Sequence, residues 1–215
     1  MQTTSVKQEY AYSNSNSGHH HAYLLPLLLP MLPSQKDSNQ PKLRVLDIGC
    51  GNGSLSHVIA QNGYEVVGVE ESESGFKFAG LSYPDCQFIQ ASIYDLPYSQ
   101  LENSFDIVIS SEVVEHLFYP RELLKAAKKC LKPNGRLILS TPYHGYLKNL
   151  ALAISNKMDS HFTVLQDGAH IKFFSVKTLT TLLSSEGYKD IKFSFAGRLP
   201  YLWKSMLCSC SPIKE

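Results

Sequence analysis

Apolar residues along this chain follow two spacings in alternation, and these spacings predict strands and helices in turn. The short apolar runs typical of strands are Val45–Ile48, Glu65–Glu70, Gln87–Gln90, Phe105–Ser110 and Arg136–Thr141. Between them, apolar residues recur every three or four positions, as at Leu55, Val58 and Ile59 or at Leu123, Leu124, Ala127 and Leu131. The pattern predicts five strand and helix units, and hence an α/β fold with a doubly wound, mostly parallel sheet.

Further segments flank this core. Near the C-terminal end, Ser175 is placed to cap a helix that Gly187 closes, and Tyr188–Ala196 is predicted to form a last strand. At the other end, residues 1–40 form a polar arm that includes a short helix at Tyr23–Leu32, while residues 41–215 form the folded domain. The apolar run in the arm is interrupted by prolines and is shorter than the roughly 20 residues that span a bilayer, so no transmembrane segment is predicted.

Composition narrows the class of protein. With 215 residues, of which 43% are hydrophobic, the chain can bury one substantial core. Its five cysteines are odd in number and scattered, and no secretory leader opens the chain, so we expect a cytoplasmic protein without disulfides. We interpret Cys208 and Cys210 as incidental thiols and not as metal ligands.

Charge divides the chain unevenly, although the net charge is only +1. Residues 1–120 hold five Lys and Arg against 13 Asp and Glu, whereas residues 121–215 hold 15 against six. Both halves could simply present solvated faces. Alternatively, the acidic half suits a cationic cofactor and the basic half attracts an anionic acceptor or a membrane surface. The overall balance gives no indication of a nucleic-acid partner.

The candidate chemistry begins at the loop after the first strand, where Gly49, Gly51 and Gly53 alternate with other residues. Glycine tolerates positive φ and has no Cβ, so main-chain N–H groups and a helix N-terminus can approach a nucleotide-like cofactor there. Glu70, at the end of the second predicted strand, could accept hydrogen bonds from ribose hydroxyls. A dinucleotide dehydrogenase remains an alternative, but its third fingerprint glycine would fall at Ser54.

Five segments in order, VLDIGCGNG, GYEVVGVEES, FIQASIYDLPY, FDIVISSEVVEHL and LKPNGRLILSTP, resemble the class I S-adenosylmethionine-dependent methyltransferases over about residues 43–195. The nearest branch is the one that contains the ubiquinone-pathway O-methyltransferases. The resemblance implies a Rossmann-like fold with an antiparallel last strand, S-adenosylmethionine as cofactor and a small-molecule methyl acceptor. It also implies that the segment at about 145–170 covers the acceptor, and that the arm folds over the cofactor as a lid.

The resemblance also implies which residues contact the cofactor. The expected set is Asp47, Gly49, Cys50, Gly51, Gly53, Glu70, Glu71, Ser92, Ile93, Ser111 and Glu112. Within it, Asp47 would support the loop that holds the methionine end, and Glu70 would bind the ribose diol. Ser92 and Ile93 would line the adenine, and Ser111 would offer its carbonyl to the cofactor's amino group.

A hydroxyl acceptor needs a general base, and the candidates lie at the carboxyl edge of the sheet, where ligands bind in such folds. His116 is the first candidate, and Tyr143 and His144 follow the fifth strand at the same edge. His116 could instead be a capping or supporting histidine. Glu112 and Glu115 could orient an acceptor, chelate a divalent ion with His116, or be surface acids; no metal is assigned.

The expected function is therefore methyl transfer to a small molecule, most simply to a hydroxyl oxygen. The alternatives are methylation at nitrogen or carbon, a lipid-like or quinone-like acceptor at a membrane surface, and a cofactor-binding module without catalysis. An amphipathic helix within residues 145–170 could shield the acceptor, make a weak membrane contact, or pack against the domain. The sequence leaves the oligomeric state open.

Overall fold

The protein is built on one seven-stranded sheet, with strand order β3-β2-β1-β4-β5-β7-β6. The computed structural model describes residues 10–34 and 40–213. The strands are β1 (Arg44–Ile48), β2 (Glu65–Glu70), β3 (Gln87–Gln90), β4 (Phe105–Ser111), β5 (Leu131–Pro142), β6 (Tyr188–Ala196) and β7 (Ser205–Pro212). Pairs are parallel except the two that β7 makes, with β5 and with β6. The strand order reverses between β1 and β4, which is where α/β sheets of this kind bind ligands, at the carboxyl ends of the strands.

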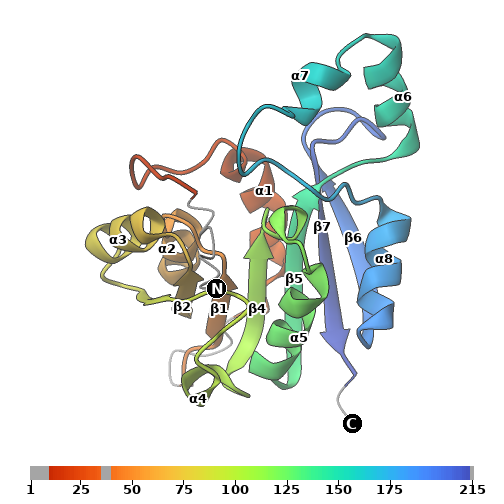
Figure 1. Cartoon of the computed structure of the whole chain (residues 1–215). Coiled ribbons are helices and arrows are strands. Elements are labelled where there is room, and N and C mark those ends of the chain that lie inside the picture. Colours follow the sequence, from red (N-terminus) through yellow and green to blue (C-terminus); the bar gives the residue numbers. More distant parts are fainter. Residues whose placement is uncertain (1–9, 35–39, 214–215) are drawn as a thin grey trace, which may run out of the picture.

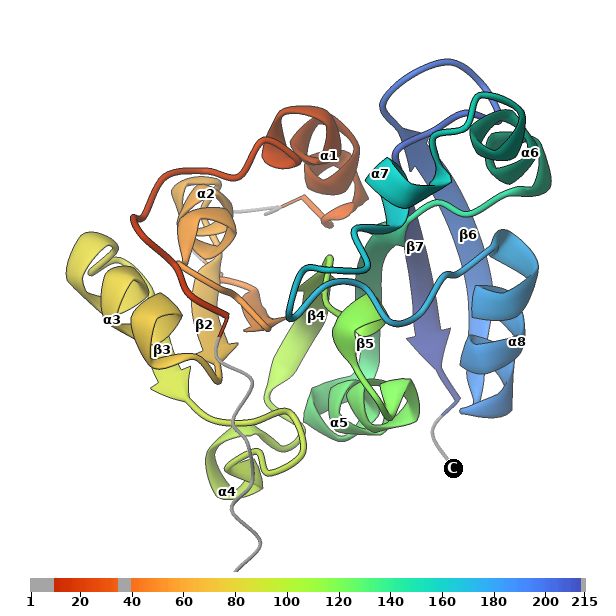
Figure 2. The same ribbon diagram turned by 45° about the horizontal axis from the view of Figure 1, so that its top comes forward.

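Helices cover both faces of the sheet. They are α1 (His21–Leu28), α2 (Ser54–Gln61), α3 (Glu73–Ser82), α4 (Tyr98–Leu101), α5 (Pro120–Cys130), α6 (Tyr146–Ile154), α7 (Met158–Phe162) and α8 (Val176–Ser185), with short 3₁₀ turns η1 (Leu29–Met31) and η2 (Val114–His116). In Figures 1 and 2, α1, α2 and α3 lie on one face and α4, α5 and α8 on the other. The segment that carries α6 and α7 rises beyond the carboxyl end of β5 (Figure 1).

Local sequence explains the ends of several helices. Pro120 opens α5, where its missing N–H has no intrahelical partner in any case. Ser175 caps α8 in a reciprocal pair with Thr178, and the Ser72 hydroxyl accepts from the Gly75 N–H at the start of α3. The helices on both faces and the strand pairings confirm the α/β class and the mostly parallel sheet predicted from the sequence.

Three features of the fold lay outside the sequence prediction. Helix α3 buries only the small residues Gly75 and Ala79, so it carries no apolar stripe that a pattern could reveal. Strand β7 was not predicted, because the segment that contains Cys208 and Cys210 was interpreted only for its thiols. Both cysteines are buried in the antiparallel strand beside β5, and all five cysteines are free. The helix predicted at Tyr23–Leu32 is present, but α1 starts earlier, at His21, and Pro26 lies within it.

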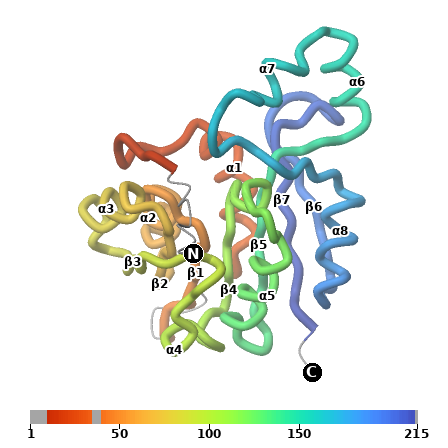
Figure 3. Tube along the Cα trace, in the orientation of Figure 1, coloured from red at the N-terminus to blue at the C-terminus, as the bar shows by residue number. Residues whose placement is uncertain are grey.

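The N-terminal arm is partly described. From Tyr10 it passes beside α2 and α3 before it reaches α1, as Figure 3 traces. Leu24 and Leu28 of α1 are buried against the sheet, in a cluster with Ile107 and Leu207. The boundary expected at residues 40 and 41 adjoins residues 35–39, which together with 1–9 lie outside the described residues, so the domain division stays a prediction. Within the described residues, no helix is both long and apolar enough to cross a bilayer.

Candidate functional site

The loop after β1 is held tightly against β2. The N–H groups of Gly49 and Cys50 both donate to the carbonyl of Val69, at 2.8 and 3.0 Å. Gly49, Gly51 and Gly53 all have positive φ, of 77°, 57° and 80°. A Cβ on Gly49 would lie 2.6 Å from the Val113 side chain, and one on Gly53 would lie 2.8 Å from the Cβ of Ala79. The loop therefore requires glycine for both conformation and space.

Glu70, the last residue of β2, holds this loop from the side. Its buried carboxylate accepts from the Gly51 N–H at 2.8 Å and from the Ser72 N–H at 2.9 Å. One side chain thus fixes both the glycine loop and the start of α3. A carboxylate has about four acceptor positions, so it can accept ribose hydroxyls in addition to these two bonds. The expected contact with ribose stays a prediction.

Asp47 supports the loop from below, at the end of β1. One carboxylate oxygen, Oδ2, accepts from the Ser56 hydroxyl at 2.7 Å, while the buried Oδ1 has no partner within the described residues. Burial raises the pKa of Asp47 to about 7, since water that would stabilise the charge is excluded. Cys50 is buried beside it, with its pKa raised by burial. The glycine cradle and the unpaired Asp47 oxygen fit a ligand with an amino group at the sheet edge.

The N-terminal arm lies directly on the loop. The Tyr12 hydroxyl lies so close to Gly51 that it would clash with a Cβ there. Burial raises the pKa of Tyr12. The Asn52 amide donates to the carbonyls of Asn14 and Asn16, at 3.0 and 2.9 Å. Sequence reasoning expected the arm to act as a lid but did not identify Tyr12 as the side chain beside Gly51.

The other expected cofactor residues surround the same edge. Ser92 and Ile93 follow β3, whose Gln90 pairs with Glu70, and Ile93 is buried. Glu71 is exposed. Ser111 ends β4, with its hydroxyl 2.9 Å from that of Ser140 on β5. The geometry gathers these residues at one edge, while their individual contacts with a cofactor stay predictions.

Two acids follow β4, of which Glu112 is partly buried and Glu115 is fully buried. Glu112 has φ of 55° and accepts from the hydroxyls of Ser140 and Ser205, at 2.9 and 3.3 Å; burial raises its pKa to about 7. Glu115 is fully buried and accepts from the Thr141 hydroxyl at 3.0 Å. Burial, followed by repulsion from Glu112, raises the pKa of Glu115. Glu115 is therefore not a surface acid, which was one of the three possibilities for it.

His116 lies next to these acids with one nitrogen available. Its Nδ1 is 2.9 Å from the Gly168 carbonyl, which can only accept, so Nδ1 carries the proton and Nε2 keeps its lone pair. Burial lowers the pKa of His116, which keeps the ring neutral. The ring of His170 lies 4.7 Å away, between centroids. An unprotonated nitrogen at the sheet edge is what a general base requires.

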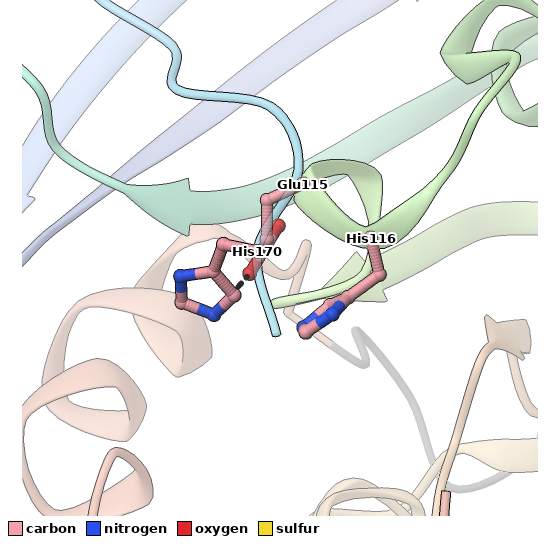
Figure 4. A group of neighbouring side chains, drawn as sticks. All are labelled: Glu115, His116 and His170. Atoms are coloured by element: carbon pink, nitrogen blue, oxygen red, sulfur yellow. Dashed lines mark ion pairs between the residues drawn. The ribbon is translucent and has the colours of Figure 1, made fainter. Parts of the chain in front are cut away.

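Glu115, His116 and His170 come together in Figure 4, where the Glu115 side chain lies between the two histidine rings. One possible ligand atom from each lies within 4.8 Å of the others, so this group could hold a metal ion. His170 was missed by sequence reasoning, because it comes from the segment between α7 and α8 and no local pattern ties it to residues 115 and 116.

A cavity of about 180 Å³ opens at the carboxyl end of β5. His144 lines it, whereas Tyr143 packs its ring against Phe195 and Trp203, with centroids at 5.7 and 5.2 Å. Burial, followed by repulsion from Lys148, lowers the pKa of His144 to about 4. Tyr143 is not among the cavity residues, and its expected role at the acceptor, like that of His144, stays a prediction.

A series of ring contacts joins the glycine loop to this cavity. Tyr12 at the loop lies 5.1 Å from Tyr10, and Tyr10 lies 6.2 Å from His116, between ring centroids. His116 in turn contacts His170, which also lines the cavity. The glycine loop and the cavity therefore lie on either side of His116.

The fold and this edge match one family. A family described as a methyltransferase domain matches residues 18–192, and the chain belongs to it. The resemblance to class I S-adenosylmethionine-dependent methyltransferases expected from the sequence is confirmed.

Two relatives are ubiquinone biosynthesis O-methyltransferases. The one from a Caulobacter species is 39% identical over 52% of this chain and 45% of its own length. The one from a Ruegeria species is 32% identical over 75% of this chain and 66% of its own length. The chain thus spans about half the length of several curated relatives that it matches. The crystal structure of an S-adenosylmethionine-dependent methyltransferase from Archaeoglobus fulgidus superposes with a TM-score of 0.64, at 19% identity, covering 87% of this chain and 92% of the other.

Proposed function

We propose that this protein transfers a methyl group from S-adenosylmethionine to a hydroxyl oxygen of a small-molecule acceptor. The observation that carries the proposal is the glycine loop, fixed by the Glu70 carboxylate at the point where the strand order reverses, with His116 facing the same edge. A sulfonium cofactor suits this acidic edge, where Asp47 and Glu70 are both buried. The names of the Caulobacter and Ruegeria relatives support oxygen as the acceptor atom.

Different residues would bind the cofactor and accept the proton. Gly49, Gly51 and Asp47 would hold the methionine end of the cofactor, and Glu70 its ribose. When bound, the cofactor supplies a methyl group already activated by the positive sulfur. The protein must then hold the acceptor in line and exclude water, which contributes more than acid–base help. His116 Nε2 would take the proton from the acceptor hydroxyl as its oxygen becomes methylated, which typically adds about 10²–10⁴-fold to the rate.

The arm and the segment at 145–170 would cover the site. Tyr10 and Tyr12 already lie between the loop and His116. Because Tyr12 lies against Gly51, cofactor entry would require the arm to shift, and its return would exclude water from the site. We expect Tyr12→Ala to speed cofactor dissociation several-fold in stopped-flow measurements, since it removes the ring that closes the loop. Tyr83→Phe removes one tether of the arm, the bond from its hydroxyl to the Ser15 carbonyl, and should speed dissociation less than Tyr12→Ala does. An unchanged dissociation rate for Tyr12→Ala would refute the lid.

Ligand-dependent unfolding tests the cofactor class. We expect S-adenosylhomocysteine to raise the melting temperature and NAD to leave it unchanged, because only a ligand that binds the folded state stabilises it. At a concentration of about 100 times Kd, the stabilisation should reach about 2.7 kcal/mol. Stabilisation by NAD alone would instead favour a dehydrogenase.

The remaining alternatives can be distinguished by analysis of the methylated product, by screening acceptors and by sedimentation with vesicles. Methylation at nitrogen or carbon would appear in the mass-spectrometric fragmentation of the product. Binding of S-adenosylhomocysteine with no transfer to any acceptor in a library would favour a non-catalytic module. On the covering segment, Tyr146, Leu147, Leu150 and Ile154 are exposed, which leaves room for a weak membrane contact. Sedimentation with anionic vesicles tests that contact, and a chain left entirely in the supernatant would exclude it.

A further inference from the structure

The cavity at the carboxyl end of β5 is lined by several positively charged side chains. Three of its lining residues are cations: Lys148 on α6, and Arg198 and Lys204 in the connection from β6 to β7. None of the residues that line it is acidic. Lys148 is buried at 5% exposure, whereas Arg198 and Lys204 are exposed. The cavity thus has one cation inside and two accessible from solvent.

These cations form no close ion pair with a carboxylate within the described part of the chain, although the Glu112 charge acts on Lys148 from farther away. The Lys148 ammonium donates to the Tyr143 carbonyl at 2.7 Å, and the Lys204 ammonium lies over the Tyr23 ring at 5.1 Å. No ion pair of the described residues includes Lys148, Arg198 or Lys204. A buried charge without a counter-ion is costly, and a bound anion would remove that cost.

The neighbouring positive charges act on one another. Burial, then the charge of Arg198, lowers the pKa of Lys148 to about 8, and Glu112 opposes the shift. Burial and then Lys148 lower the pKa values of His144 and His161. Arg198 also adopts φ of 63°, a left-handed conformation that costs free energy for a residue with a Cβ.

Aromatic side chains complete the cavity. Phe162 and Phe173 meet edge to face at 4.9 Å, and the His144 ring stacks on Phe162 at 5.9 Å, between centroids. Flat apolar walls beside cations suit a ring that carries a negative group. His170 joins the cavity to His116, so a ligand seated here lies next to the proposed base.

We propose that this cavity is the binding subsite for an oxyanion, a carboxylate or phosphate, carried on an aromatic methyl acceptor, with Lys148 and Arg198 as its charge partners. This inference rests on the proposed function in one respect, namely that the bound ligand is the methyl acceptor. The subsite itself rests only on the cavity, its cations and its aromatic walls. The acceptor's hydroxyl would then be directed toward His116.

Binding without turnover tests the subsite. Titration calorimetry on the full chain would compare phenol, benzoate and phenyl phosphate, which share a ring and differ in charge. We expect at least one of the two anions to bind at least tenfold more tightly than phenol, with an affinity that falls as salt rises. Which of the two binds more tightly identifies the oxyanion as a carboxylate or a phosphate.

Charge-removing variants assign the binding to these residues. Arg198→Gln and Lys148→Met should each weaken anion binding about tenfold and leave phenol binding unchanged. Because Arg198 is exposed, its variant is expected to fold even if the Lys148 variant does not. Arg136 is an exposed arginine on β5 that pairs with Ile107 of β4, so Arg136→Gln provides the matched control and should bind as the parent does.

Several outcomes would overturn the proposal. These are equal affinity for phenol and both anions, unchanged anion affinity in Arg198→Gln, or inorganic phosphate binding as tightly as phenyl phosphate. Because neither cofactor nor methyl transfer enters the assay, anion binding would persist in a chain that fails to methylate. Failure of the subsite and failure of the proposed function are therefore separate results.

Discussion

Glu70→Ala is expected to weaken S-adenosylhomocysteine binding by more than tenfold, or about 1.4 kcal/mol, in titration calorimetry. The change removes the acceptor of both the Gly51 and the Ser72 N–H groups. Each buried donor left unpaired costs about 1–3 kcal/mol, so the glycine loop should lose its fixed conformation as well as the proposed ribose contact. We therefore expect a lower melting temperature along with the weaker binding.

An acid at the opposite end of the same strand provides the control for this variant. Glu65→Ala removes the same charge from an exposed side chain at the start of β2, and should alter affinity less than twofold. If Glu70→Ala folds and binds S-adenosylhomocysteine as tightly as the parent, both its support of the loop and its contact with ribose are refuted.

The second large effect is expected in His116→Ala, with a loss of about 10²–10⁴-fold in kcat and little change in cofactor affinity. His116 is placed to accept a proton through Nε2, because Nδ1 is committed to the Gly168 carbonyl. Burial holds the pKa of His116 below its usual value, so the ring is already neutral at neutral pH. The parent's kcat should thus fall only as pH drops through that lowered pKa, and this fall should disappear in the variant.

His57→Ala is the control, since this histidine lies on α2, pairs with Asp85 at 2.8 Å and stacks on Tyr83. Its kcat and pH profile should match those of the parent. The kcat of His116→Ala could instead stay within threefold of the parent's and fall at low pH as the parent's does. That result would show that His116 only supports the segment at Gly168. Such a result would leave cofactor binding by the glycine loop untouched.

Local patterns predicted what depends on near neighbours in the chain. The strands β1 to β4, and β5 from Arg136 onward, followed from short apolar runs, and α5 and α8 from their apolar spacing and first-turn residues. Leu131 was assigned to a helix but begins β5. The glycine loop was predicted from three alternating glycines, which can be identified without knowing their contacts in the fold. All three have positive φ in the structure. Strand β7 was not predicted, because its segment was interpreted only for its two thiols and its place in the sheet depends on pairing with β5 and β6.

The sequence by itself determined the α/β class, the glycine loop and the set of candidate acids and histidines, because each depends on periodicity or on adjacent residues. Only the tertiary structure placed Tyr12 on Gly51, His170 beside His116, and Arg198 near Lys148 in one cavity. These residues come from the arm, the segment after α7 and the β6 to β7 connection. Their proximity arises from long-range packing, which leaves no periodic trace in the chain.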